Sequence, residues 1–173
     1  MCTCNENSQQ FAVSIIVTNQ SGTLTRISSL FSQRNFNIDS FTCGETNNPQ
    51  VSRMTITATG DASKKIQLLK QISKLYDVKK VELMTPENTI LRELLIAKVK
   101  ATGETLQTIL DVANVFRSKV VDVSPGSVCI EMTGESNKLN AFLTYVAPYG
   151  ILEYCRTGLV AVERGNKCLY GVE

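Results

Sequence analysis

The segment T-N-Q-S-G-T at 18–23 has the residue types of an anion-binding loop, and it lies between a strand-like apolar run and a segment with helical spacing. Asn19 or Ser21 could cap the following helix, and Gly22 would let a ligand or another chain approach the backbone. The unpaired N–H groups and the positive dipole end of a helix start favour a carboxylate. Many strand-to-helix turns contain these residues, so the loop alone does not establish a site.

Asn37 and Ile38 form a second candidate element at the start of the next expected strand. The side-chain carbonyl of Asn37 could accept a hydrogen bond from an ammonium group, and Ile38 could form an apolar wall. If two copies pair so that this strand start faces the partner's loop, the two elements would enclose a small apolar amino acid. Taken alone, Asn37 is typical of a turn, so the geometry of the folded protein decides between a turn residue and a ligand-binding residue.

Histidine is absent from the 173 residues. This absence excludes Ser-His-Asp and Cys-His nucleophilic systems, His-ligated zinc and a histidine general base. Asp122 and Glu131 are expected on strands at an unknown separation, so they do not define an acid/base pair. What remains to an enzyme is carboxylate, lysine or cysteine chemistry, or a role in which another protein does the chemistry, and we assign no catalytic residue.

The cysteines lack the spacing of a disulfide framework, which predicts free thiols and a reducing cytoplasm. They stand at positions 2, 4, 43, 129, 155 and 168. Cys2 and Cys4 form a C-x-C pair, but two thiols on a polar tail without further ligands favour a disordered tail over a metal site.

Charge and hydropathy restrict the partners. Lys and Arg number 18 against 16 Asp and Glu, a net charge of +2, without a dense basic patch in either half. Nucleic acid is therefore a disfavoured partner. The N-terminus lacks the basic region and apolar core of a signal peptide, and no apolar run approaches the ~18 residues of a membrane span.

The first half of the chain has the pattern β-α-β-β-α-β, which is the ferredoxin-like arrangement. Strand-like runs lie at 11–18, 36–44, 51–60 and 76–84. Apolar residues at helical spacing in the first helix predict one buried stripe, formed by Leu24, Ile27, Leu30 and Phe31. Threonines alternate with apolar residues in the third run, which predicts a half-exposed strand.

After Pro86 the same order of elements begins again, so we predict an α+β protein of two ferredoxin-like βαββαβ domains in tandem. The predicted division is a tail at 1–10, domains at 11–85 and 91–165 joined by a linker at 86–90, and a tail at 166–173. A domain of about 60 residues buries only about 60% of its unfolded surface. We therefore expect association through sheet faces or edges.

Several motifs resemble the small, regulatory subunit of acetohydroxyacid synthase, also called acetolactate synthase. TNQSGTLTRISSLFSQRNFNIDS at 18–40 and PQVSRMTI at 49–56 resemble that family's N-terminal ACT domain. VANVFRSKVVDVSPGSVCIEMTGESNKLNAFL and RTGLVAVERG resemble its second domain and its ending. The resemblance covers roughly residues 10–165, and the motifs occur in the family's order.

The resemblance implies a non-catalytic subunit that binds and activates a large catalytic subunit and confers feedback inhibition by a branched-chain amino acid, usually valine. Leucine and isoleucine stay open as effectors. Thiamine diphosphate, Mg and FAD are expected on the catalytic subunit, a transferase that condenses pyruvate with a 2-oxoacid, and no cofactor is expected on this chain.

In this family the effector binds between the ACT domains of a small-subunit homodimer. Carried over by position, the site takes a loop and helix start from one chain and a strand start from the other: Asn19, Ser21, Gly22, Thr23 and Leu24, with Asn37 and Ile38. The backbone N–H groups at 21–23 would bind the carboxylate and Asn37 the ammonium, while Leu24 and Ile38 would contact the side chain.

One departure is Thr18, where family members often have Glu, and we expect it to tune the pocket. Three alternatives stay open: an RNA-binding module, an autonomous enzyme, and a free-standing amino-acid sensor of another pathway. An RNA-recognition domain needs exposed aromatic residues on its central strands, and 51–60 has none. Copurification with a large thiamine-dependent subunit would separate the regulator from the free-standing sensor.

Overall fold

The computed structural model describes residues 8–170, which form two compact units. Of these described residues, unit 1 contains those up to Ile90 together with those from Gly158 onwards, and unit 2 is Leu91–Thr157. Each unit has the order β-α-β-β-α-β, so the predicted pair of ferredoxin-like folds is confirmed. Cys2 and Cys4 lie outside the described residues.

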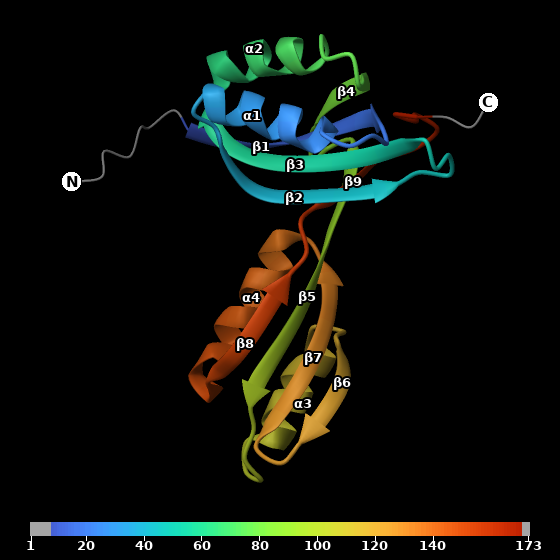
Figure 1. The fold of residues 1–173 in the computed structure, drawn as a ribbon. Helices are drawn as coiled ribbons and strands as arrows, with labels where there is room; N and C mark the ends of the chain where they lie inside the picture. The colour runs from blue at the N-terminus through green and yellow to red at the C-terminus, as the bar shows by residue number, and fades with distance from the viewer. Residues whose placement is uncertain (1–7, 171–173) are drawn as a thin grey trace. The chain divides into compact units, whose positions relative to one another are not determined.

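Unit 1 is an antiparallel sheet of strand order β2-β3-β1-β4, with α1 and α2 on one face (Figure 1). Its elements are β1 (Ser8–Thr18), α1 (Thr23–Gln33), β2 (Asn37–Glu45), β3 (Val51–Asp61), α2 (Ala62–Ile72) and β4 (Val78–Met84). Because β2 and β4 are the outer strands of this order, β1 and β3 form its centre.

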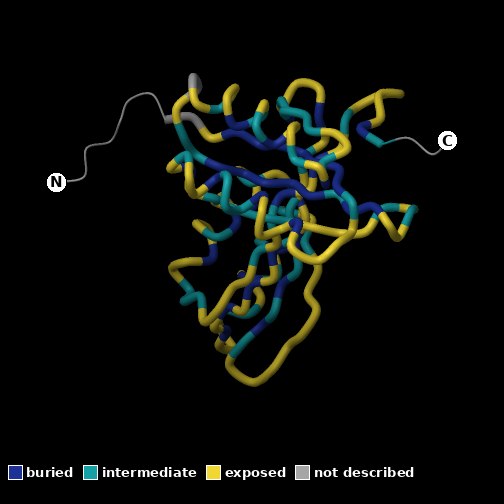
Figure 2. The backbone as a smooth tube through the Cα atoms, turned by 45° about the horizontal axis from the view of Figure 1, so that its top comes forward, coloured by how far each residue is buried: buried dark blue, intermediate teal, exposed yellow. Residues whose placement is uncertain are grey.

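Alternate residues of the central strands form the core beneath the helices, as period-2 side-chain direction requires. These residues and the helix positions packed on them are fully buried: Val13, Ile15, Val17, Ile27, Phe31, Ile56, Leu68 and Ile72 (Figure 2). Gly60 is needed in this packing, since a Cβ there would lie 2.1 Å from Cε1 of Phe36.

The other face of this sheet is covered by the chain's own C-terminal part. The prediction of a half-exposed third strand is therefore wrong: Thr55 and Thr57 of β3 are only 3% and 8% exposed. β9 (Val160–Glu163) and the residues around it provide the cover. Leu169 is also buried, in a small cluster with Ile16 and Val51.

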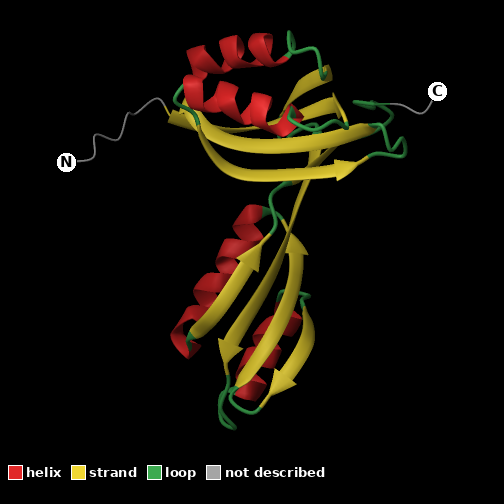
Figure 3. Ribbon diagram, viewed as in Figure 1, coloured by secondary structure: helices red, strands yellow, loops and turns green. Residues whose placement is uncertain are grey.

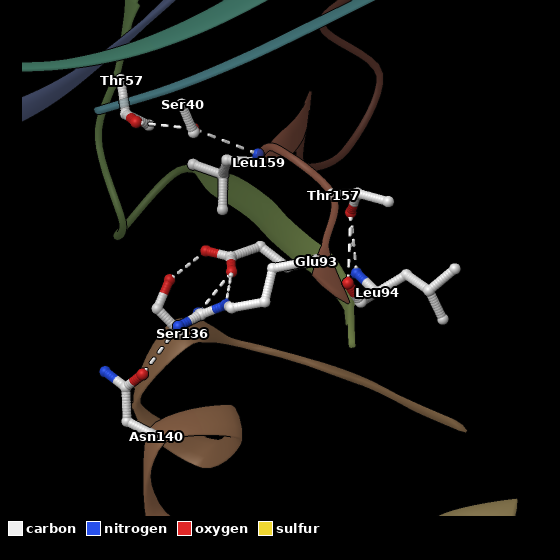
Figure 4. A network of polar contacts seen from close by, with 9 residues as sticks. Ser40, Thr57, Glu93, Leu94, Ser136, Asn140, Thr157 and Leu159 are labelled. Carbon is white, nitrogen blue, oxygen red and sulfur yellow. Dashed lines mark hydrogen bonds and ion pairs between the residues drawn. The ribbon is translucent and has the colours of Figure 1, made fainter. Parts of the chain in front are cut away.

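Hydrogen bonds hold this cover on β2 and β3 (Figure 4). Leu159 donates its N–H to Ser40 Oγ at 3.4 Å and accepts a bond from Thr42 Oγ1 at 2.6 Å. Arg53 Nη2 donates to the carbonyl of Ala161 at 2.7 Å. Burial lowers the pKa of Arg53 from its ordinary value, whereas the nearby Glu163 carboxylate acts in the opposite direction.

The chain therefore returns to unit 1 at Gly158, whereas the sequence pattern placed 91–165 in the second domain. Glycine is required at this return, because a Cβ on Gly158 would lie 2.7 Å from the carbonyl oxygen of Phe41. Local periodicity predicts a strand at 160–163 but carries no information on the face against which that strand packs.

Unit 2 repeats the architecture, with strand order β6-β7-β5-β8 and α3 and α4 on one face (Figure 3). Its elements are β5 (Thr89–Lys100), α3 (Leu106–Val115), β6 (Lys119–Ser124), β7 (Ser127–Gly134), α4 (Ser136–Val146), the 3-10 turn η1 (Ala147–Tyr149) and β8 (Ile151–Arg156). β5 begins within unit 1, and β9 pairs with it.

A polar network within unit 2 joins β5, α4 and β8 (Figure 4). Glu93 accepts a bond from Arg156 Nε at 3.0 Å and one from the hydroxyl of Ser136. Arg156 Nη1 also donates to Asn140 at 2.7 Å. Because every charged group here has a partner, the network ties the strands to the helix and presents no free reactive group. Across residues 8–170, no helix is long and apolar enough to span a membrane.

Candidate functional site

The loop between β1 and α1 leaves backbone donors open at the start of the helix. Gly22 is the N-cap, with φ of +87°, and no side chain caps the helix. The N–H groups of Ser21 and Gly22 donate to no described residue. An uncapped helix start with free donors is a suitable place for a carboxylate.

The prediction that Asn19 or Ser21 caps this helix is wrong, because Gly22 occupies the cap position. Asn19 instead contacts the connection between β2 and β3. Its Nδ2 donates to the Pro49 carbonyl at 2.9 Å and to Glu45 Oε1 at 3.1 Å. Asn19 therefore fixes the loop against the end of β2.

Thr23 and Leu24, the first residues of α1, have unusual environments. Thr23 is 2% exposed, and its Oγ1 has no hydrogen-bond partner among the described residues, which is costly for a buried hydroxyl. Leu24 was predicted in the buried stripe with Ile27 and Phe31, but it is 47% exposed. A buried polar atom and an exposed apolar side chain thus adjoin the open N–H groups.

Asn37 and Ile38 begin β2, where a register shift follows Ile38. Asn37 Nδ2 donates to Asp39 Oδ1 at 3.0 Å, and Asp39 Oδ2 accepts from Thr59 Oγ1 at 2.7 Å. These two hydrogen bonds fix the orientation of the Asn37 amide and leave its Oδ1 without a described donor. Asn37 is exposed and Ile38 half-buried, so both are accessible from outside one chain.

Within one chain, the two predicted halves of the site lie at opposite ends of the sheet. Thr18, beside the loop, pairs with Val51 at the start of β3, whereas Asn37 pairs with Thr59 near its end. At about 3.4 Å per residue, these ends are about 27 Å apart. The structure therefore does not bring Asn19–Leu24 together with Asn37 and Ile38 in a single chain.

Sequence reasoning missed Asp77, which lies beside the same loop. Asp77 is 4% exposed and forms an ion pair with Arg26 at 2.5 Å. Its backbone carbonyl accepts the N–H of Thr18 at 2.8 Å. An acidic residue directly before a strand was the available signal, but only the fold shows that its partner is in α1.

Unit 2 has a groove of about 370 Å³ at the equivalent strand-to-helix loop, lined by 101–103, Leu106 and 123–126. There the hydroxyls of Thr102 and Thr105 accept two of the loop's N–H groups: each hydroxyl accepts the other residue's N–H, at 3.3 and 2.8 Å. Across residues 8–170, no three His, Cys, Asp or Glu side chains gather as metal ligands. The loop of unit 1 is therefore the stronger candidate.

Each of the two units matches the model of a known protein family. Residues 13–80 match a family model described as an AHAS small subunit-like ACT domain. Residues 92–165 match one described as the small subunit of acetolactate synthase.

Individual relatives match nearly end to end. The chain is 43% identical to the acetolactate synthase small subunit of Haemophilus influenzae, over 90% of this chain and 96% of that protein. It is 44% identical to that of Mycolicibacterium smegmatis, over 90% and 91%. The crystal structure of the small subunit from Thermotoga maritima is 37% identical, with a TM-score of 0.83 over 92% of this chain and 99% of that one.

Proposed function

Because the chain belongs to the family of acetolactate synthase small subunits, we propose that it activates a large catalytic subunit and makes it sensitive to feedback inhibition. Valine is the proposed effector, with leucine and isoleucine as the alternatives. In this proposal the chain carries no catalytic residue and no cofactor. Thiamine diphosphate, Mg and FAD belong to the catalytic subunit.

The observation that carries the effector proposal is the separation of two incomplete half-sites on one sheet. The loop at 19–24 offers free N–H groups and an exposed Leu24, and the start of β2 offers Asn37 Oδ1 and Ile38. A second copy of the chain is needed to join them.

Pairing of two β2 strands provides a simple way to join the half-sites. β2 is an outer strand, and its far end contacts the loop because Asn19 binds Glu45. In an antiparallel pair centred on Phe41, Asn37 of one copy lies opposite Glu45 of the other. Each homodimer then has two equivalent sites, as two-fold symmetry requires.

In such a site the effector's carboxylate binds the N–H groups of Ser21 and Gly22. Asn37 of the second copy accepts a bond from the ammonium, and Leu24 and Ile38 contact the side chain. By linkage, the effector inhibits only if it binds one arrangement of the dimer more tightly than another.

A mixing experiment tests whether the site lies between chains. Gly22→Asp impairs the loop and Asn37→Ala impairs the strand start, so calorimetry should show that each homodimer binds valine at least about tenfold more weakly than the wild type. A mixed dimer has one intact site, so mixing the two variants should restore binding. Absence of restoration in verified heterodimers would contradict a shared site.

A direct titration tests the effector itself. Valine should bind the wild-type chain saturably, and Asn37→Ala should weaken it by about tenfold or more, because a hydrogen bond to a charged group contributes about 1.5–3 kcal/mol. The variant should still copurify with the catalytic subunit. If no branched-chain amino acid binds the wild type, the effector proposal fails.

A further inference from the structure

Arg26, in the first turn of α1, has one guanidinium nitrogen free beside the candidate loop. Its Nε and Nη2 lie 2.6 and 2.5 Å from Oδ2 of Asp77. Its Nη1 has no partner among the described residues, and the side chain is half exposed. The ion pair therefore uses two of the three nitrogens and leaves the third for another acceptor.

Asp77 determines where that free nitrogen points. A carboxylate that is 4% exposed needs its counter-charge, so it holds the guanidinium in one orientation. The carbonyl of Asp77 also accepts the N–H of Thr18 at 2.8 Å and its hydroxyl at 3.4 Å. Asp77 thus contacts Thr18 and Arg26, the residues that flank the loop on either side.

The free nitrogen lies next to Gly22. A Cβ built on Gly22 would be 3.3 Å from Nη1 of Arg26, so the guanidinium occupies the space above the bare α-carbon. The N–H groups of Ser21 and Gly22 are open in the same loop. A carboxylate bound by those N–H groups would have a cationic donor beside it.

We propose that Arg26 is a further effector-binding residue whose Nη1 donates a charge-assisted hydrogen bond to the carboxylate, and that Asp77 is its positioning residue. This inference rests on the proposed function and adds a residue to its site. A charged donor favours a carboxylate over an uncharged group of the same shape. Arg26 therefore makes the site selective for a free amino acid over its amide.

The test compares valine with valinamide, which retains the ammonium and the isopropyl group but has no carboxylate. Calorimetry on the full chain should show that Arg26→Gln weakens valine binding by about tenfold and valinamide binding by less than about twofold. Arg34→Gln is the matched control, since Arg34 is the C-cap residue of the same helix and donates to Gln71 at 3.1 Å. This control should change neither affinity.

Arg26→Gln leaves Asp77 buried without its counter-charge, so the double variant Arg26→Gln/Asp77→Asn provides the same test without an unpaired charge. Equal losses for both ligands in this double variant, or no loss for either, would overturn the role of Arg26. If the wild type binds no branched-chain amino acid, the proposed function itself fails. Asp77→Asn alone should weaken valine binding less than Arg26→Gln does, because it frees the Arg26 guanidinium to move without removing it.

Discussion

The two units place a strand-to-helix loop at the same point of the same fold, but they treat its backbone donors differently. In unit 1, α1 has no side-chain cap, Gly22 has a positive φ, and the N–H groups of Ser21 and Gly22 are open. In unit 2, α3 also has no side-chain cap, but the hydroxyls of Thr102 and Thr105 each accept the other residue's N–H.

Because the topology is the same in both units, the side chains of the loop and not the fold make unit 1 the candidate binding site. The loop of unit 2 has two threonine hydroxyls that accept its own N–H groups, and it carries Glu104, whose charge disfavours a bound carboxylate. The loop of unit 1 keeps an open helix start, a buried Thr23 hydroxyl without a partner and an exposed Leu24.

The units also differ on the face of the sheet that the helices leave free. In unit 1 that face is covered by residues from Gly158 onwards, so Thr55 and Leu169 are buried. In unit 2 it is exposed: Ile96 lies between the buried Leu95 and Ala97 and is 43% exposed.

The largest expected effect is on valine affinity, compared between one substitution in the loop of unit 1 and one in the loop of unit 2. Gly22→Asp forces a side chain into a left-handed backbone and against Arg26, so valine affinity should fall by about 100-fold or more. Gly103→Asp meets nothing within 4 Å and should leave calorimetric valine affinity unchanged. Comparable losses in both variants would remove the distinction between the loops.

A second substitution pair tests the covered and open faces. Leu169→Ala should lower the free energy of unfolding by about 2–3 kcal/mol, because it leaves a cavity over Ile16 and Val51. Ile96→Ala removes a side chain that is already partly in water and should cost less than about 1 kcal/mol. Urea titrations would measure both, and similar costs would mean that the cover is not tightly packed in solution.

Threonine-to-valine substitutions should have opposite effects on stability in the two loops. Thr23→Val removes a buried hydroxyl without a described partner and should stabilise the chain by about 1 kcal/mol. Thr102→Val removes the hydroxyl that accepts the Thr105 N–H, which keeps the Thr102 carbonyl as its other acceptor, and should destabilise by less than about 1 kcal/mol without affecting valine binding. Denaturation and calorimetry on each variant check both signs, and a destabilising Thr23→Val would show that the hydroxyl is bonded in solution.

The smallest expected effect concerns an exposed ion pair of the cover. Hydrogen bonds to Glu163 and Glu82 raise the pKa of Lys167 above its ordinary 10.5. A raised pKa means that the contribution to stability is complete below 10.5 and is lost as the pH rises through the folded value. The small difference in melting temperature between wild type and Lys167→Met should therefore disappear at high pH. Lys167→Arg should keep its difference from Lys167→Met at that pH, because arginine stays charged. A difference that persists would assign the effect to packing.

Most of the fold was predictable because it depends on local spacing. Apolar residues at periods of 2 and 3.6 gave both βαββαβ units, and the family resemblance of the motifs is confirmed by the matches to residues 13–80 and 92–165. The site residues Asn19–Leu24 and Asn37–Ile38 stay a prediction for a dimer. Leu24 was misplaced in the core because helical spacing does not show where the covering sheet ends.

The sequence by itself determined the order of the elements, the exclusion of histidine chemistry and the family, since all three depend on residue types and their spacing along the chain. Only the tertiary structure decided that Gly158–Tyr170 packs with unit 1, that Asp77 orients Arg26, and that the half-sites lie at opposite ends of one sheet. These are contacts between residues distant in sequence, such as Thr42 with Leu159. The physical reason is that burial and hydrogen-bond satisfaction are properties of the packed sheet, which local periodicity does not encode.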